Sequence, residues 1–99
     1  MSSAAIGFLN LYLHIPGCAS LKEKRRRLKP LIARLQREFN ISVAEIDHQD
    51  IWQNALIGCV MISNDAVFTR KNLSNIVKWI DHNWPDIDLV DEEIEIFSA

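Results

Sequence analysis

The stretch ISVAEIDHQDIWQNALIGCVMI, residues 41–62, decides the fold because it predicts two neighbouring strands between two helical segments. Residues 41–46 are rich in β-branched side chains, and residues 51–62 form a longer apolar run typical of a strand that is partly buried on both faces. The polar residues 47–50 lie between them and predict a turn. We therefore expect an antiparallel hairpin here.

A basic amphipathic helix is expected before the hairpin. Ser20 and Glu23 form the pattern S-L-K-E, a capping box that satisfies free backbone N–H groups at a helix start. The apolar residues that follow have the spacing of one helix face: Leu28, Leu31, Ile32, Leu35 and Phe39. Pro30 predicts a kink near Arg26–Pro30, and the alternative is a second helix that begins at Pro30.

A second helix is expected after the hairpin, with Asn64 or Asp65 as its N-cap and Pro85 at its end. Its apolar residues repeat the spacing of the first helix: Leu73, Ile76, Val77, Ile80 and Trp84. Residues 87–97 then predict an acidic strand in which Val90, Ile94 and Ile96 face inward. The run Asp91-Glu92-Glu93 interrupts the alternation and predicts a bulge.

Residues 5–15 predict the first strand, which Pro16-Gly17 ends. Leu9, Leu11 and Leu13 alternate onto one face of it, and the opposite face receives Phe8, Asn10, Tyr12 and His14.

The predicted order is β-α-β-β-α-β, the α+β plan of a ferredoxin-like fold with a four-stranded antiparallel sheet and both helices on one face. Right-handed crossovers place the first and third strands in the centre, in the order 4-1-3-2. We expect residues 1–99 to form a single domain of this kind.

Two blocks of sequence resemble a known family. They are LHIPGCASLKEKRR, residues 13–26, and VAEIDHQDIWQNALIGCVMISND, residues 43–65. Together they resemble the YlxP-like family, small bacterial proteins of unassigned function. The resemblance covers essentially the whole chain and implies a ferredoxin-like fold, a cytoplasmic location and, through the neighbourhood of translation genes, a link to the ribosome. It implies no catalytic residues, and Pro30 departs from the family pattern.

The charge is distributed unevenly along the chain. Of the eleven Lys and Arg residues, eight lie in residues 20–39 beside only two acidic residues. Residues 81–99 hold seven acidic residues and no basic one. The formal net charge of −2 therefore conceals a strongly basic segment and a strongly acidic one.

The composition excludes several classes of protein. A hydrophobic fraction of 48% with 24% charged residues excludes wholesale disorder. No apolar run approaches the roughly 18 residues of a membrane span, and the N-terminus lacks the pattern of a signal peptide, so we expect a cytoplasmic protein. Cys18 and Cys59 form no C-x-x-C motif, and we expect two free thiols.

The basic helix is the strongest functional signal. The helical period turns six cations away from the apolar face, in a pattern suited to phosphate contacts: Lys22, Arg26, Arg27, Lys29, Arg34 and Arg37. Lys24 and Arg25 fall at the edges of the apolar face, where their stems are expected to cover the core. The alternative is a solvated face, or one paired with acidic residues 81–99.

The sequence gives little evidence for base stacking on the sheet, for a cofactor or metal site, or for catalysis. The expected third strand lacks the aromatic residues with which an RNA-recognition motif stacks bases. No P-loop, nucleophile motif or zinc-like ligand spacing is present, so we expect no cofactor, no metal and no enzyme. His48 and Asp50 could form an acid–base pair, but a turn explains them better.

Aromatic side chains predict interaction surfaces. Phe8 and Tyr12 lie on the sheet face that the helices leave open, which predicts a homodimer through that face. Phe68 and Trp79 project from the second helix, either to contact a partner or to pack against the first helix or a strand.

From these observations we expect a non-enzymatic accessory protein that is associated with RNA or the ribosome. The alternative is a dimeric module that binds a small ligand, like ferredoxin-like ACT domains, with the turn at Gly17 as its ligand site.

Overall fold

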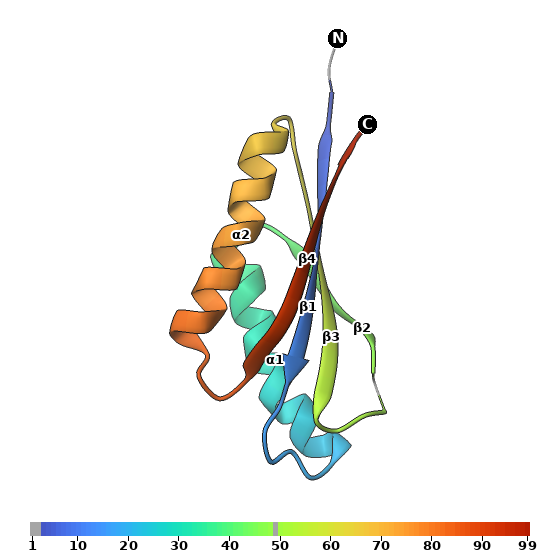
Figure 1. Ribbon diagram of the computed structural model, residues 1–99, viewed down its shortest axis with the longest axis vertical. Helices are drawn as coiled ribbons and strands as arrows, with labels where there is room; N and C mark the ends of the chain where they lie inside the picture. The colour runs from blue at the N-terminus through green and yellow to red at the C-terminus, as the bar shows by residue number, and fades with distance from the viewer. Residues whose placement is uncertain (1–2, 49) are drawn as a thin grey trace.

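The computed structural model of the chain describes residues 3–48 and 50–99 and confirms the predicted element order (Figure 1). The elements are β1 (Ala5–His14), α1 (Leu21–Glu38), β2 (Ser42–Asp47), β3 (Asn54–Ser63), α2 (Ala66–Asn83) and β4 (Asp88–Ser98). The strands form one antiparallel sheet in the order β2-β3-β1-β4, and both helices cover the same face. The fold is therefore the expected ferredoxin-like arrangement. Gln49, part of the predicted turn, lies outside the described residues.

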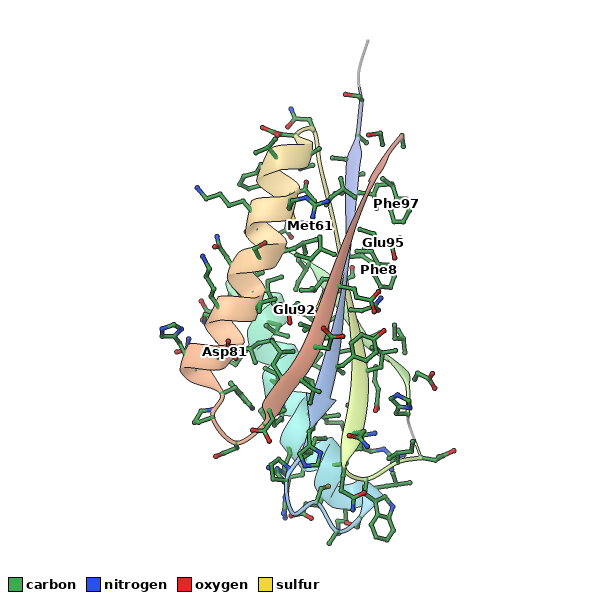
Figure 2. All side chains as sticks on the ribbon, viewed as in Figure 1. Phe8, Met61, Asp81, Glu92, Glu95 and Phe97 are labelled. Carbon is green, nitrogen blue, oxygen red and sulfur yellow. The ribbon has the colours of Figure 1, made fainter. Side chains whose placement is uncertain are left out.

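The two faces of β1 separate core from surface as the alternation predicts. Leu9, Leu11 and Leu13 are at most 2% exposed and lie under the helices. Figure 2 shows Met61 on this helix side of the sheet, and Phe8 and Phe97 on the side that no helix covers. Each central strand thus contributes one face to the core and one face to the open side.

Strand β3 begins three residues later than predicted. The backbone N–H of Ile15 donates to the Gln53 carbonyl at 2.7 Å, and the Gln53 side chain donates to the Cys18 carbonyl at 3.0 Å. These bonds hold the segment before Asn54 against the loop between β1 and α1 instead of in the ladder with β2. Ile51 and Trp52 are consequently exposed loop residues, at 42% and 45%.

The bulge in β4 lies one residue before its predicted position. Tyr12 pairs with Asp91 while Leu13 pairs with Leu89, so Val90 is the extra residue. Val90 is 67% exposed, and the expectation that it faces inward is wrong. Because the bulge shifts the alternation, Leu89 packs against the core in its place. Ile94 and Ile96 face inward as predicted: both pack against the core.

Both helices begin at side-chain caps. Ser20 Oγ accepts from the Glu23 N–H at 3.1 Å, and the Glu23 carboxylate accepts from the Ala19 N–H at 2.7 Å, one residue before the N-cap. Helix α1 then continues through Pro30 to Glu38, so no second helix begins at the proline. Asp65, not Asn64, caps α2 by accepting from two backbone N–H groups.

Gly7 permits the close approach of α2 to the sheet. A Cβ atom at this position would overlap the Thr69 methyl group and lie 2.7 Å from Leu73 Cδ1. Thr69 and Leu73 are fully buried on α2. The absence of a side chain at Gly7 therefore sets the distance between α2 and β1.

We predict that Gly7→Ala destabilises the protein by roughly 1–3 kcal/mol, because the added methyl group overpacks this contact. Gly58→Ala is the matched control, since a Cβ there meets only the Ile46 and Phe8 side chains, at 3.1 Å or more. Thr69→Ser in the Gly7→Ala background removes the obstructing methyl group and should restore part of the loss. Urea unfolding measures all three; equal effects of the two glycine substitutions would contradict this account.

Candidate nucleic-acid interface

A buried ammonium group joins α1 to β2. Lys24 is 1% exposed, and its Nζ atom lies 2.7 Å from Glu45 Oε2 and 2.5 Å from the His48 carbonyl oxygen, to which it donates. The contact with Glu45 is an ion pair by distance, although that oxygen accepts no well-directed hydrogen bond. His48 has a left-handed backbone, with φ of 64°, and its carbonyl is held in place by Lys24.

The hydrogen bond from Lys24 to His48 brings together the two sequence blocks that carry the family resemblance. The loop between β1 and α1 contains Cys18, whose carbonyl accepts from Gln53 of the loop between β2 and β3. Lys24, in the first turns of α1, reaches His48 at the start of the same loop. The two loops and the N-terminal end of α1 therefore form one connected end of the molecule.

Lys24 is buried together with Leu28, Leu31 and Leu35, and these four residues define which face of α1 meets solvent. Lys24 covers the core as predicted, whereas Arg25 is exposed and the expectation that its stem covers the core edge is wrong. The reason is that only Lys24 is within reach of an acceptor and a carboxylate on β2 and its loop. The exposed cations of α1 are Lys22, Arg25, Arg26, Lys29 and Arg37.

Two of the six predicted phosphate-binding residues point toward the protein. Arg27 donates from both terminal nitrogens, to the Pro16 and Asp86 carbonyls at 2.6 Å each, and so links the loop before α1 to the turn after α2. Arg34 lies over the Trp79 ring at 5.5 Å and pairs with Glu38 at 3.4 Å. Arg27 thus links two parts of the fold and Arg34 contacts Trp79 and Glu38, which the helical period alone did not reveal.

The exposed cations lie on adjacent turns. Lys22 and Arg26 are four residues apart, as are Arg25 and Lys29, so the helix places like charges next to each other. Each such pair destabilises a helix by roughly 0.2–0.5 kcal/mol. Lys22 in the first turn also opposes the helix dipole. Helix stability therefore does not explain this cluster, whereas Arg37 in the last turn complements the dipole.

The acidic segment does not neutralise the basic helix. Within residues 3–48 and 50–99, the ion pairs of α1 join Lys24 to Glu45, Arg26 to Glu23 and Arg34 to Glu38. None involves residues 81–99. The pair of Arg26 is long, at 3.9 Å, and its side chain is 77% exposed.

Of the two aromatic residues predicted on α2, Trp79 packs between the helices. Its ring meets Phe39 edge-on, with centroids 6.2 Å apart, and lies 5.9 Å from Trp84. This is the packing alternative considered for it. Phe68, in the first turn of α2, is 54% exposed.

The open face of the sheet is apolar at one end and polar at the other. Paired positions across β3, β1 and β4 place Ile62, Ile6 and Phe97 in one row, and Val60, Phe8 and Glu95 in the next. The row at the far end is polar: Asn54, His14 and Asp88. Figure 2 shows Phe8, Glu95 and Phe97 projecting from this face.

Tyr12 lies in the row between these ends. Its hydroxyl donates to Glu93 Oε1 at 2.8 Å, and this bond, together with burial and the charges of Glu93 and Asp91, raises the pKa of Tyr12 above its usual value. The phenol therefore stays protonated and bonded to β4 at neutral pH.

Groups suited to nucleophilic or metal chemistry are buried or scattered. Cys18 and Cys59 are free, as predicted; both are buried, and burial raises the pKa of Cys59 to about 12. A protonated thiol is a poor nucleophile. Outside Gln49 and the first two residues, no three Cys, His, Asp or Glu side chains gather closely enough to hold a metal ion. In the same residues, neither helix is long and apolar enough to cross a membrane.

Comparison with known proteins decides the family. Residues 6–94 match the family described as "Protein of unknown function (DUF503)". The chain belongs to this family. It is 40% identical over 83 residues to the uncharacterized protein YlxP of Bacillus subtilis (strain 168), across 84% of this chain and 89% of that protein. The predicted YlxP-like resemblance is thus confirmed, and the DUF503 family has no assigned function.

Among solved structures, the de novo designed protein Foldit4 is similar in fold. The TM-score is 0.51 at 12% sequence identity, over 97% of this chain and 96% of that chain. A likeness at this identity concerns the arrangement of helices and strands alone. This likeness therefore assigns no function to the DUF503 member.

We predict that Lys24→Met destabilises the protein by roughly 2–4 kcal/mol, because it leaves the Glu45 carboxylate without its counter-ion and the His48 carbonyl without its donor. Lys29→Met is the matched control on an exposed position of the same helix, and should change stability by less than about 0.5 kcal/mol. A double-mutant cycle that combines Lys24→Met with Glu45→Gln measures the coupling energy between the two side chains. Equal unfolding free energies for the two lysine variants would refute the structural role of Lys24.

Proposed function

We propose that this protein is a non-enzymatic accessory protein that binds RNA through the outer face of α1. The supporting observation is the cluster of exposed like charges: Lys22, Arg25, Arg26 and Lys29. An arrangement that costs helix stability is favourable when phosphate oxygens supply the missing negative charge. Phosphates also suit the N-terminal half of a helix, where the dipole is positive.

The distribution of charge supports one orientation of RNA on the protein. Three acidic residues of β4 pair with open-face positions of β1 and lie on the face away from the helices: Asp91, Glu93 and Glu95. The cations of α1 lie on the helix side. RNA is therefore attracted to the helix side and repelled from the open sheet face.

The chemistry of this surface favours contacts to the RNA backbone. Lysine and arginine side chains on an exposed helix bind phosphates, and such contacts carry no base information by themselves. The translation-linked gene neighbourhood that the family resemblance implies makes ribosomal RNA the target we propose.

We predict that replacing Lys22, Arg25 and Lys29 with Gln lowers affinity for single-stranded RNA and makes its salt dependence shallower, by up to about 0.7 in the log–log slope for each lost contact. The matched control replaces the three exposed cations of α2, Arg70, Lys71 and Lys78, with Gln, which changes the net charge equally. Fluorescence anisotropy across a salt series measures both.

The control separates a specific face from overall charge. If both triple variants lose affinity equally, the protein attracts RNA only through its total charge and α1 is not the binding face. If the parent protein binds no RNA even at low salt, the proposed function itself is wrong.

We also propose that the protein is a homodimer through the open sheet face. Five large apolar residues gather there: Ile6, Phe8, Val60, Ile62 and Phe97. Ile62 is 67% exposed and Phe97 49%, which is unfavourable for a monomer in water. A two-fold axis parallel to the strands sets the acidic β4 edge of one copy against the neutral β2 positions of the other, so the acidic rows avoid each other.

We predict that light scattering at micromolar concentration gives a molar mass near twice 11.4 kDa, and that Ile62→Lys converts the protein to a monomer. Val67→Lys is the matched control, because Val67 is 79% exposed on α2, away from the sheet. A monomeric parent at every concentration would exclude the dimer. A dimer whose stability responds to a metabolite would instead favour the ACT-like alternative.

A further inference from the structure

A pocket lies beside the basic face of α1, between that helix and the turn that follows α2. Its volume is about 210 Å³, and it is open to solvent. The lining residues are Arg26, Arg27, Pro30, Trp84, Asp86 and Ile87. Its lining therefore includes two arginines, a tryptophan and an aspartate, beside the exposed cations of α1.

The walls of this pocket are held in place before any ligand arrives. Arg27 bonds to the Asp86 carbonyl at 2.6 Å and so ties α1 to the turn that carries Trp84. The Trp84 ring packs 5.9 Å from Trp79, and Trp79 lies under Arg34 and against Phe39. A preformed aromatic surface loses little entropy when a planar ligand stacks on it.

The groups in the pocket suit different parts of a nucleotide. Trp84 and Pro30 offer flat apolar surface for a base, and base–aromatic stacking is favourable for every base. Arg26, 77% exposed at the rim, is free to meet the adjoining phosphate. The negative charge of Asp86, another lining residue, disfavours a phosphate in the interior, and a carboxylate is a suitable acceptor for the amino or imino groups of a base.

We propose that this pocket receives one unpaired base of the RNA, stacked on Trp84, while Arg26 binds its phosphate. The inference rests on the proposed function and deepens it, because it adds a base contact to a surface otherwise limited to the backbone. It also predicts a preference for single strands, loops or bulges over duplex RNA, since a paired base cannot enter.

The test compares two single-stranded oligoribonucleotides of equal length and charge, one with bases and one abasic throughout. We expect the parent protein to bind the base-bearing strand roughly tenfold more tightly. Arg26→Gln should lower the affinity for both strands. Trp84→Leu should lower only the affinity for the base-bearing strand, and reduce the difference in affinity between the two strands to about twofold or less.

Tryptophan fluorescence provides a second readout that does not depend on a stable Trp84→Leu variant. In a Trp52→Phe background, only Trp79 and Trp84 emit, and the base-bearing strand should quench this emission while the abasic strand does not. Equal affinities for the two strands, with no quenching, would overturn the base pocket. If those affinities still depended on Lys22, Arg25 and Lys29, the backbone-binding function would stand without it.

Discussion

Burying a charged ammonium group in a domain of this size is unfavourable unless the group finds partners, and Lys24 finds two of them on β2 and the loop after it. Together with the three buried leucines on the same face, this constraint sets the rotation of α1 about its own axis. Once Lys24 faces inward, the helical period directs Lys22, Arg26 and Lys29 outward. The same contact holds the left-handed backbone of His48 and connects the two loops at this end of the molecule.

The remainder of the charge pattern follows from the sheet. Antiparallel pairing with β1 brings β4 to the edge, and its alternation sends Glu93 and Glu95 to the face that the helices leave open. The basic residues of α1 and the acidic open-face residues of β4 are far apart in the sequence and lie on opposite sides of the structure, whereas Asp86 lies beside α1. A protein with one basic and one acidic side presents a single surface to a polyanion, and the apolar end of the open face remains available for a second copy.

The fold could be predicted from the sequence because apolar periodicity and caps determine it. Leu9, Leu11 and Leu13 alternate without interruption, and Ser20 and Asp65 mark the helix starts. Element ends were less predictable, since Gln53 leaves the ladder to bond with the distant Cys18. No local pattern shows a partner thirty-five residues away.

The candidate site could be predicted only in part for the same reason. Periodicity placed Lys22, Arg26 and Lys29 correctly on the outer face. It could not show that Arg27 donates hydrogen bonds to carbonyl oxygens of two loops. Nor could it show that the Trp84 ring borders a pocket beside Arg26. Contacts between loops depend on the assembled fold, and sequence spacing within one helix does not contain them.

Acetylation footprinting of the lysine residues, read by mass spectrometry with and without bound RNA, tests this account most directly. The five lysines are Lys22, Lys24, Lys29, Lys71 and Lys78. Without RNA, Lys24 should react far more slowly than the other four; with RNA, Lys22 and Lys29 should become protected while Lys71 and Lys78 of α2 remain reactive. If Lys24 reacts as fast as Lys71, or if RNA protects the α2 lysines and leaves Lys22 and Lys29 unchanged, the account is contradicted.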